Sequence, residues 1–97
     1  MQYKPRPGIV PAKICGLHVL IPTRAAYDHC KSIIRLPKLW AITYDMITKE
    51  EPEENMIRLH KILTKKPEEE IKRRIDHFCE ELAKNGFLIK DSGEDEQ

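Results

Sequence analysis

The sequence predicts an α+β domain in which a three-stranded antiparallel sheet is followed by three helices, an order also typical of winged helix-turn-helix domains. The first observation is the hydrophobic period, which changes from two residues before Pro37 to about 3.6 residues after it. The second is composition: of 97 residues, 40% are hydrophobic and 34% are charged, which fits one ordered globular domain. Because the chain begins with Met1, we expect a single complete domain over residues 1–97, ordered from about residue 9 to 89.

The first two strands are expected to form a hairpin. Two short β-rich runs, Ile9 to Cys15 and Leu17 to Ile21, flank Gly16, which predicts a tight turn or a bulged bend. Pro11 restricts the first run to a sheet edge or a strand start, because proline offers no N–H to a ladder. The first eight residues are interpreted as a stiff, exposed lead-in, and the segment TRAAYDHC as a polar turn before the third strand.

The third strand is expected over Lys31 to Leu36, and its alternating side chains form two unlike faces. The face that suits the core carries Ser32, Ile34 and Leu36. The other face carries Lys31, Ile33 and Arg35. A protein that blocks a sheet edge often places a proline or a bulge in mid-strand, and this strand has neither, so we expect its outer edge to be open. In the alternative interpretation, the two cations only discourage unwanted edge pairing.

Three amphipathic helices are expected after the sheet, beginning near Pro37, Pro52 and Pro67. The third helix has apolar residues at helical spacing, at Ile71, Ile75, Phe78, Cys79 and Leu82. Acidic and basic residues four positions apart predict a solvated, self-paired face on the same helix. Asn85-Gly86 predicts a left-handed C-terminal cap, after which residues 87–89 fold back onto the core. The acidic tail, residues 90–97, is expected to be disordered.

The sequence argues against catalysis by this chain alone and against a bound cofactor. It has no glycine-rich phosphate loop, no Gly-x-Ser-x-Gly and no His-Glu-x-x-His. No apolar run approaches the roughly 20 residues that span a bilayer, so no membrane partner is expected. Three widely spaced cysteines fit reduced thiols, and therefore a cytoplasmic location.

The sequence leaves two other functional classes open. A small metal or thiol protein would use Cys15, His18 and Cys30, but neighbouring strand residues such as His29 and Cys30 point to opposite faces and do not easily share one ion. A winged-helix DNA-binding protein is the alternative function. Against it, the third helix opens with three glutamates and the net charge is +1, whereas phosphate contacts need lysine or arginine.

Two motifs in this order and spacing resemble the PqqD-like family, the recognition elements for ribosomally made precursor peptides. Members of that family typically show a Leu-Asn-x-x-(Ala)-x-x-(Ile/Leu)-Trp-like start to the first helix and an Asp-x-x-x-Phe-x-x-x-Leu-x-x-x-Gly-(Leu/Phe)-(Leu/Ile) run at the end. The matching segments here are LPKLWAITYDMI and DHFCEELAKNGFLI, and the likeness covers residues 9–89. The sequence departs from the pattern at Pro37, where the family has asparagine, at Tyr44, where it has tryptophan, and in the spacing after Asp76.

The resemblance implies a catalyst-free module that binds the leader segment of a precursor peptide. The leader would add a strand to the third strand, beside the third helix, and be presented to a radical SAM protein or another peptide-modifying enzyme. The residues expected to contact the peptide are Lys31, Ile33, Ile34, Arg35, Lys72, Ile75, Asp76 and Cys79. The open edge also permits a homodimer when no leader is present. The sequence leaves open the identity of the peptide and enzyme, and which flank of the third helix faces the peptide.

Overall fold

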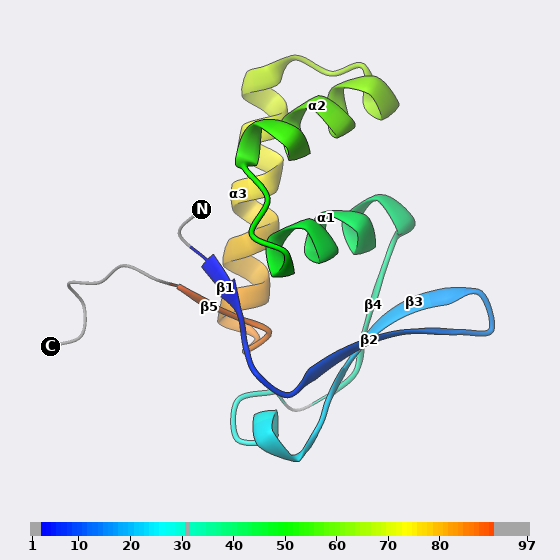
Figure 1. Ribbon diagram of the computed structural model, residues 1–97, viewed down its shortest axis with the longest axis vertical. Helices are drawn as coiled ribbons and strands as arrows, with labels where there is room; N and C mark the ends of the chain where they lie inside the picture. Colours follow the sequence, from blue (N-terminus) through cyan, green and yellow to red (C-terminus); the bar gives the residue numbers. More distant parts are fainter. Residues whose placement is uncertain (1–2, 31, 91–97) are drawn as a thin grey trace, which may run out of the picture.

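The α+β prediction is confirmed by the computed structural model, which describes residues 3–30 and 32–90 (Figure 1). The strands are β1 (Tyr3–Pro5), β2 (Ile9–Ile14), β3 (Leu17–Pro22), β4 (Ile34–Leu36) and β5 (Leu88–Lys90). The helices are α1 (Lys38–Thr48), α2 (Glu53–Thr64) and α3 (Glu68–Lys84), with a short 3-10 turn, η1 (Arg24–Ala26), in the segment interpreted as a turn. An antiparallel sheet has the strand order β2-β3-β4, and β1 pairs separately with β5.

The expected hairpin is formed by β2 and β3, which pair in register from Ile9 opposite Pro22 to Ile14 opposite Leu17. Its two turn residues, Cys15 and Gly16, both have positive φ, 52° and 79°. This is the backbone conformation of the two-residue turns that match the twist of a hairpin. β2 lies at one edge of its sheet, as Pro11 requires.

β4 is shorter than predicted: Ile34–Leu36 form the strand, whereas the described residues Ser32 and Ile33 do not, and Lys31 lies outside the described residues. The register gives the reason: Leu20 is opposite Ile34, so the next pairs would place Ile21 opposite Ile33 and Pro22 opposite Ser32. Pro22 has no N–H to donate, and the ladder ends before that point. The expectation that this strand lies at a sheet edge is confirmed, because β4 pairs with β3 and is last in the strand order.

The interpretation of the N-terminus as an exposed lead-in is wrong. Residues 3–5 form β1, which pairs with β5 near the other end of the chain, Tyr3 opposite Lys90. The side chain of Arg6 strengthens this connection, since its Nε donates to the carbonyl oxygen of Gly86 at 2.6 Å. The ordered region therefore begins before residue 9. Residues 91–97, predicted to be disordered, lie outside the described residues.

The three helices begin where the sequence predicts, and α3 also ends where it predicts. Pro37, Pro52 and Pro67 are the N-cap residues of α1, α2 and α3. At the end of α3, Gly86 adopts φ 90°, its N–H bonds the carbonyl of Ala83, and the N–H of Phe87 bonds the carbonyl of Leu82. These two bonds form a Schellman cap, as Asn85-Gly86 predicted.

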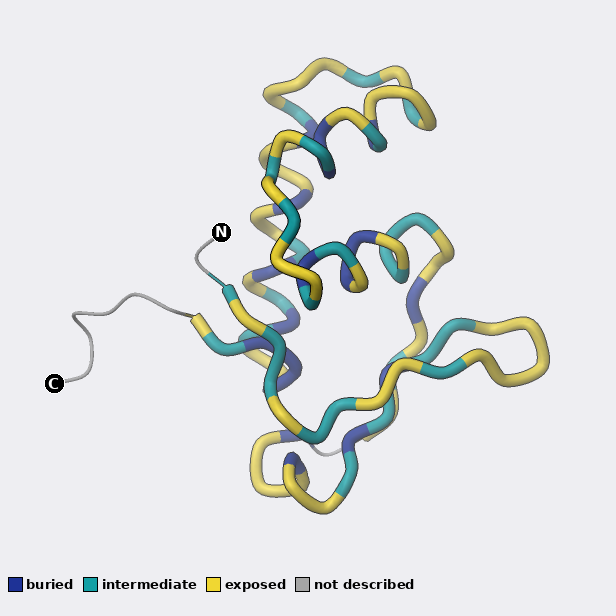
Figure 2. Tube along the Cα trace, viewed as in Figure 1, coloured by how far each residue is buried: buried dark blue, intermediate teal, exposed yellow. Residues whose placement is uncertain are grey.

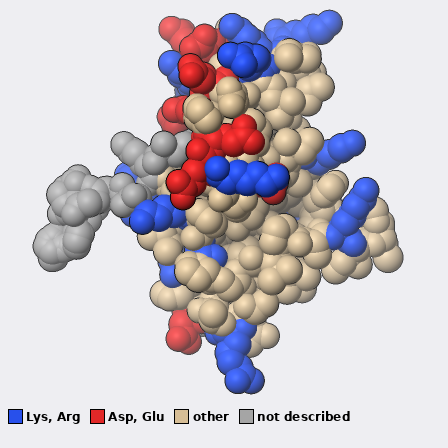
Figure 3. Space-filling view, viewed as in Figure 1, with Lys and Arg blue, Asp and Glu red and all other residues tan. Residues whose placement is uncertain are grey.

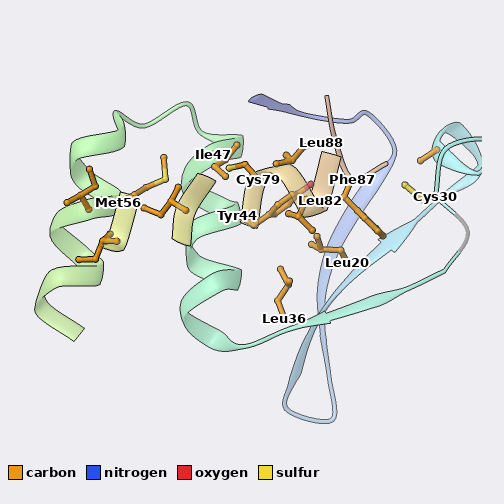
Figure 4. Close-up of a cluster of buried hydrophobic side chains, with 14 residues drawn as sticks. Leu20, Cys30, Leu36, Tyr44, Ile47, Met56, Cys79, Leu82, Phe87 and Leu88 are labelled. Carbon is orange, nitrogen blue, oxygen red and sulfur yellow. The ribbon is translucent and has the colours of Figure 1, made fainter. Parts of the chain in front are cut away.

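The core lies between the three helices and the two sheets (Figures 2 and 4). α1 packs against β1, β3 and β4, while α3 packs against β5 and α2. Figure 4 draws Leu20, Leu36, Tyr44, Cys79 and Phe87 within one cluster. The β2-β3 hairpin extends away from the helices, and its tip is exposed (Figure 2). None of the helices in the described part of the chain is long and apolar enough to cross a bilayer.

Candidate functional site

An open groove of about 750 Å³ runs between the end of β4, the start of α1 and one flank of α3. We call it the β4–α3 groove. It is lined by Leu36, Pro37, Trp40, Glu70, Arg73, Arg74, His77, Phe78 and Glu81. The local sequence explains its position: Pro37 ends β4 and caps α1, so Trp40 is carried on the first turn of α1 opposite the middle of α3.

The floor of the β4–α3 groove is apolar and aromatic. Leu36 contributes a largely buried side chain, and Trp40 and Phe78 are half-buried. The rings of Trp40 and Phe78 lie with centroids 4.6 Å apart at an interplanar angle of 35°. A floor of this kind accepts an apolar side chain, because its exposed ring surface is removed from water when the groove is filled.

Charged side chains of α3 form the rim of the groove. Glu70 accepts ion pairs from Arg74 at 3.4 Å and Lys66 at 3.5 Å, so these charges are largely matched within the protein. Arg73, also on the rim, is exposed and has no ion pair among the described residues. The rim therefore offers at least one unmatched guanidinium to a ligand carboxylate.

A buried histidine supports the aromatic floor from below. His60 on α2 is 1% exposed, and its ring lies edge-on to Trp40 at a centroid distance of 4.7 Å. Its Nε2 lies 2.8 Å from the hydroxyl of Thr43. Burial, with a smaller contribution from the charge of Arg74, lowers the pKa of His60 below its ordinary 6.5. The imidazole is therefore neutral at pH 7.

This lowered pKa predicts a loss of stability in mild acid. Below pH 6.5 the unfolded chain takes up a proton on residue 60 that the folded domain resists, so the free energy of unfolding falls as pH drops. One such proton contributes up to about 1.4 kcal/mol per pH unit. Urea denaturation of the parent and of His60→Gln at pH 7 and pH 5 measures the effect. The parent should lose more stability than the variant over that interval; an equal loss would contradict a buried neutral imidazole.

The backbone edge of β4 is open beside the groove. In residues 3–30 and 32–90, no strand pairs with its outer side, and its ladder partners all belong to β3. Leu36, the last residue of β4, is also a groove residue, so the free edge leads directly to the aromatic floor. An extended chain that paired with β4 would thus bring its next side chains over Trp40.

The strand residues predicted as contacts have different environments. Ile34 is half-buried against the core, and Ile33 is 55% exposed. Ile33 lines a second hollow of about 540 Å³, together with Tyr27 and Cys30, rather than the β4–α3 groove. Arg35 is exposed and has no ion pair within the described residues. Lys31 lies outside the described residues.

The predicted contacts on α3 lie off the groove. Ile75 and Cys79 are 0% exposed and belong to the core, so they offer no surface to a peptide. At about 100° per residue, Lys72 lies about 160° around the helix axis from Glu70, and Asp76 lies about 120° from it; neither residue lines the groove. The electrostatics agree, because the pKa of Tyr3 in β1 is raised first by burial and then by carboxylates that include Asp76. Lys72 is paired with Glu68 at 3.5 Å.

Sequence reasoning missed the residues that line the groove: Trp40, Arg73, Arg74, His77 and Phe78. No binding role was predicted for Trp40, and the basic residues of α3 were interpreted as part of a solvated face. A signal was present in the spacing of Glu70, Arg74, His77 and Glu81, which places them on one flank of a helix beside the apolar face. The spacing does not predict which element of the fold lies opposite that flank.

The metal and thiol hypothesis has little support in the structure. Within the described residues, no three histidine, cysteine or acidic side chains are placed to hold an ion. Cys15 is exposed at the hairpin turn, whereas Cys30 is buried. Burial, with the nearby charges of Asp76 and Glu53, raises the pKa of Cys79 to about 12, so that thiol stays protonated.

The charge distribution does not resemble a nucleic-acid interface on the face seen in Figure 3. Basic side chains there are interspersed with acidic ones over the helices, and the lower part of this face is largely uncharged. The first turn of α3, which a winged helix would present to DNA, is exposed at Glu68 and Glu69. The neighbouring cations Lys61 and Lys72 pair with Glu68, which leaves less positive charge for phosphates.

Comparison of the chain with family models, with curated proteins and with solved structures finds no match.

Proposed function

We propose that this domain binds an extended peptide by strand addition to β4 and presents it to a peptide-modifying enzyme. The observation that carries the proposal is the unpaired edge of β4, which ends at an aromatic groove with an unmatched arginine on its rim. Main-chain hydrogen bonds to a sheet edge give affinity with little demand on sequence, while side-chain pockets select the partner. The domain provides both elements side by side.

The groove favours a peptide with an apolar side chain followed by carboxylates. The apolar side chain would cover the floor at Trp40 and Phe78, and a carboxylate would approach Arg73. The PqqD-like resemblance of the two motifs supports a leader segment of a ribosomally made precursor as that peptide. It equally supports a radical SAM protein, or another peptide-modifying enzyme, as the recipient.

Amide NMR tests this function directly. A synthetic leader from an open reading frame next to this gene is titrated into 15N-labelled protein. We expect the amides of Ile34 to Leu36 and those of Arg73 to Phe78 to shift, while the hairpin tip at Cys15 and Gly16 stays unchanged. Binding that leaves the β4 and α3 amides unmoved would overturn the proposed site. A random DNA duplex at physiological salt serves as the test of the alternative function, and we expect no shift with it.

A second copy of the protein is the competing occupant of the free edge. Sedimentation over a range of protein concentrations, with and without the leader, separates the two cases. Dimers that dissociate when leader is added would indicate that both use β4. Dimers that persist with bound leader would place the dimer contact elsewhere.

The two flanks of α3 provide a matched pair of charge reversals. Arg73→Glu should weaken leader binding by about 1–2 kcal/mol, roughly tenfold, because it places a carboxylate at the groove rim. Lys72→Glu introduces the same charge at the neighbouring position, which does not line the groove. It disturbs only an exposed ion pair with Glu68 and should leave affinity nearly unchanged. Isothermal titration calorimetry measures both. Equal losses, or a larger loss for Lys72→Glu, would show that the peptide lies on the other flank.

A further inference from the structure

We propose that His60 is a positioning residue for the β4–α3 groove: together with Thr43 it holds the indole of Trp40 in the orientation that forms the floor. The proposal rests on the proposed function, since it concerns how the groove is preorganised for a peptide. His60 does not line the groove, and Thr43 is fully buried, so both act through Trp40.

The hydrogen bonds determine which atom of this pair carries each proton. The Thr43 hydroxyl has one hydrogen, which it donates to the carbonyl oxygen of Leu39 at 2.9 Å. The same oxygen lies 2.8 Å from Nε2 of His60, so this nitrogen must be the donor in that bond. The tautomer and the direction of the ring are therefore both set by α1. This connection is independent of any ligand.

Trp40 lies between two rings that come from two other helices. His60 contacts it edge-on from α2, with an interplanar angle of 63°, and Phe78 lies against it from α3 at 35°. Removing the support on the α2 side would leave only one ring to orient the indole. A side chain free to change rotamer loses that freedom on binding, which lowers affinity, so a locked indole favours binding.

The surroundings of His60 favour its neutral form. The groups that face it are Thr43 and Trp40 from α1, both uncharged, and the cation Arg74 from α3, which is itself paired with Glu70. Protonation would add a second positive charge close to Arg74 in a buried position. Acid should therefore disturb the support of Trp40.

The test uses the intrinsic fluorescence of Trp40, the one tryptophan in the chain. Thr43→Val removes the hydroxyl and keeps the shape, whereas Thr43→Ser keeps the hydroxyl. Thr48→Val is the matched control, because its hydroxyl bonds only the Asp45 carbonyl of the same helix. Acrylamide quenching is measured on free protein. Affinity is measured with the tightest dodecapeptide selected from a random phage-displayed library.

In Thr43→Val, acrylamide should quench the fluorescence of Trp40 more readily than in the parent. The variant should also bind the dodecapeptide about fivefold more weakly, which corresponds to one hydrogen bond of about 1 kcal/mol. Thr43→Ser and Thr48→Val should match the parent in both. If Thr43→Val does not fold, His60→Gln replaces it, and Trp40 emission is followed from pH 7.5 to 5; the parent should change below pH 6.5 and the variant should not.

Unchanged quenching, or unchanged affinity with raised quenching, in a folded Thr43→Val would overturn the positioning role. The positioning role would also be overturned if the Trp40 emission of the parent did not change over this pH range, or if it changed by the same amount in His60→Gln. A parent protein that enriches no peptide from the library would contradict the proposed function instead. In that case the quenching of free protein still decides whether His60 holds Trp40, so the two failures are distinct.

Discussion

Gly86→Ala should destabilise the domain by about 3–5 kcal/mol. Part of the cost, about 1–2 kcal/mol, comes from placing an L-residue at a φ of 90°. The rest comes from space, because a Cβ there would meet the backbone of His29, 2.7 Å from its carbonyl carbon, and the Cys30 sulfur at 3.0 Å. Backbone cannot move aside as a flexible side chain does, so overpacking of this kind adds a few kcal/mol.

Gly16→Ala is the control for this prediction. Gly16 also has positive φ, 79°, but a Cβ there meets no atom within 4 Å. The control should therefore show only the conformational cost of about 1–2 kcal/mol. Urea denaturation monitored by circular dichroism measures both variants. Equal destabilisation of the two would mean that the close packing of the α3 cap against residues 29 and 30 is not as the structure has it.

Trp40→Ala should reduce leader binding by at least about 2 kcal/mol, roughly thirtyfold, because the floor of the β4–α3 groove loses its largest side chain. Tryptophan is enriched among the residues that dominate binding energy at interfaces. In this domain its indole also contacts the rings of both His60 and Phe78. Truncation therefore removes contact surface and lets the remaining rings rearrange.

Trp40→Phe is the matched variant, since it retains an aromatic ring in the floor and should lose only part of the affinity. Calorimetric titration with the leader peptide measures both, and circular dichroism verifies that each variant is folded. An alanine variant that is folded and binds as tightly as the parent would place the peptide away from the groove. Strand addition to β4 would then have to be supported without the β4–α3 groove as the side-chain pocket.

These predictions differ in how far the sequence alone leads to them. The cap at Asn85-Gly86, the hairpin at Gly16 and the helix starts at three prolines follow from the backbone preferences of single residues. Such preferences act within a few residues, so one sequence contains all the information needed to predict them. The clash that makes Gly86 sensitive is different, because residues 29 and 30 approach it from another part of the chain.

The candidate site was predicted in part. The edge position of β4 and the exposure of Arg35 agree with the alternation of its residues. The length of β4 does not follow from that alternation, because it depends on Pro22 in the neighbouring strand and on the pairing register. Likewise the apolar period of α3 predicted Ile75 and Cys79 correctly as apolar-face residues but could not assign that face to the core instead of a peptide.

The sequence by itself determined the order of the β2-β3 hairpin, β4 and the three helices, the turn and cap positions and the apolar face of each helix, since local sterics and periodicity decide these. Only the tertiary structure decided that β1 pairs with β5, that Trp40 on α1 faces the Arg73 flank of α3, and that His60 lies beneath it. These are contacts between segments far apart in the chain. Their geometry depends on how the whole core packs, and no local preference of the residues involved specifies it.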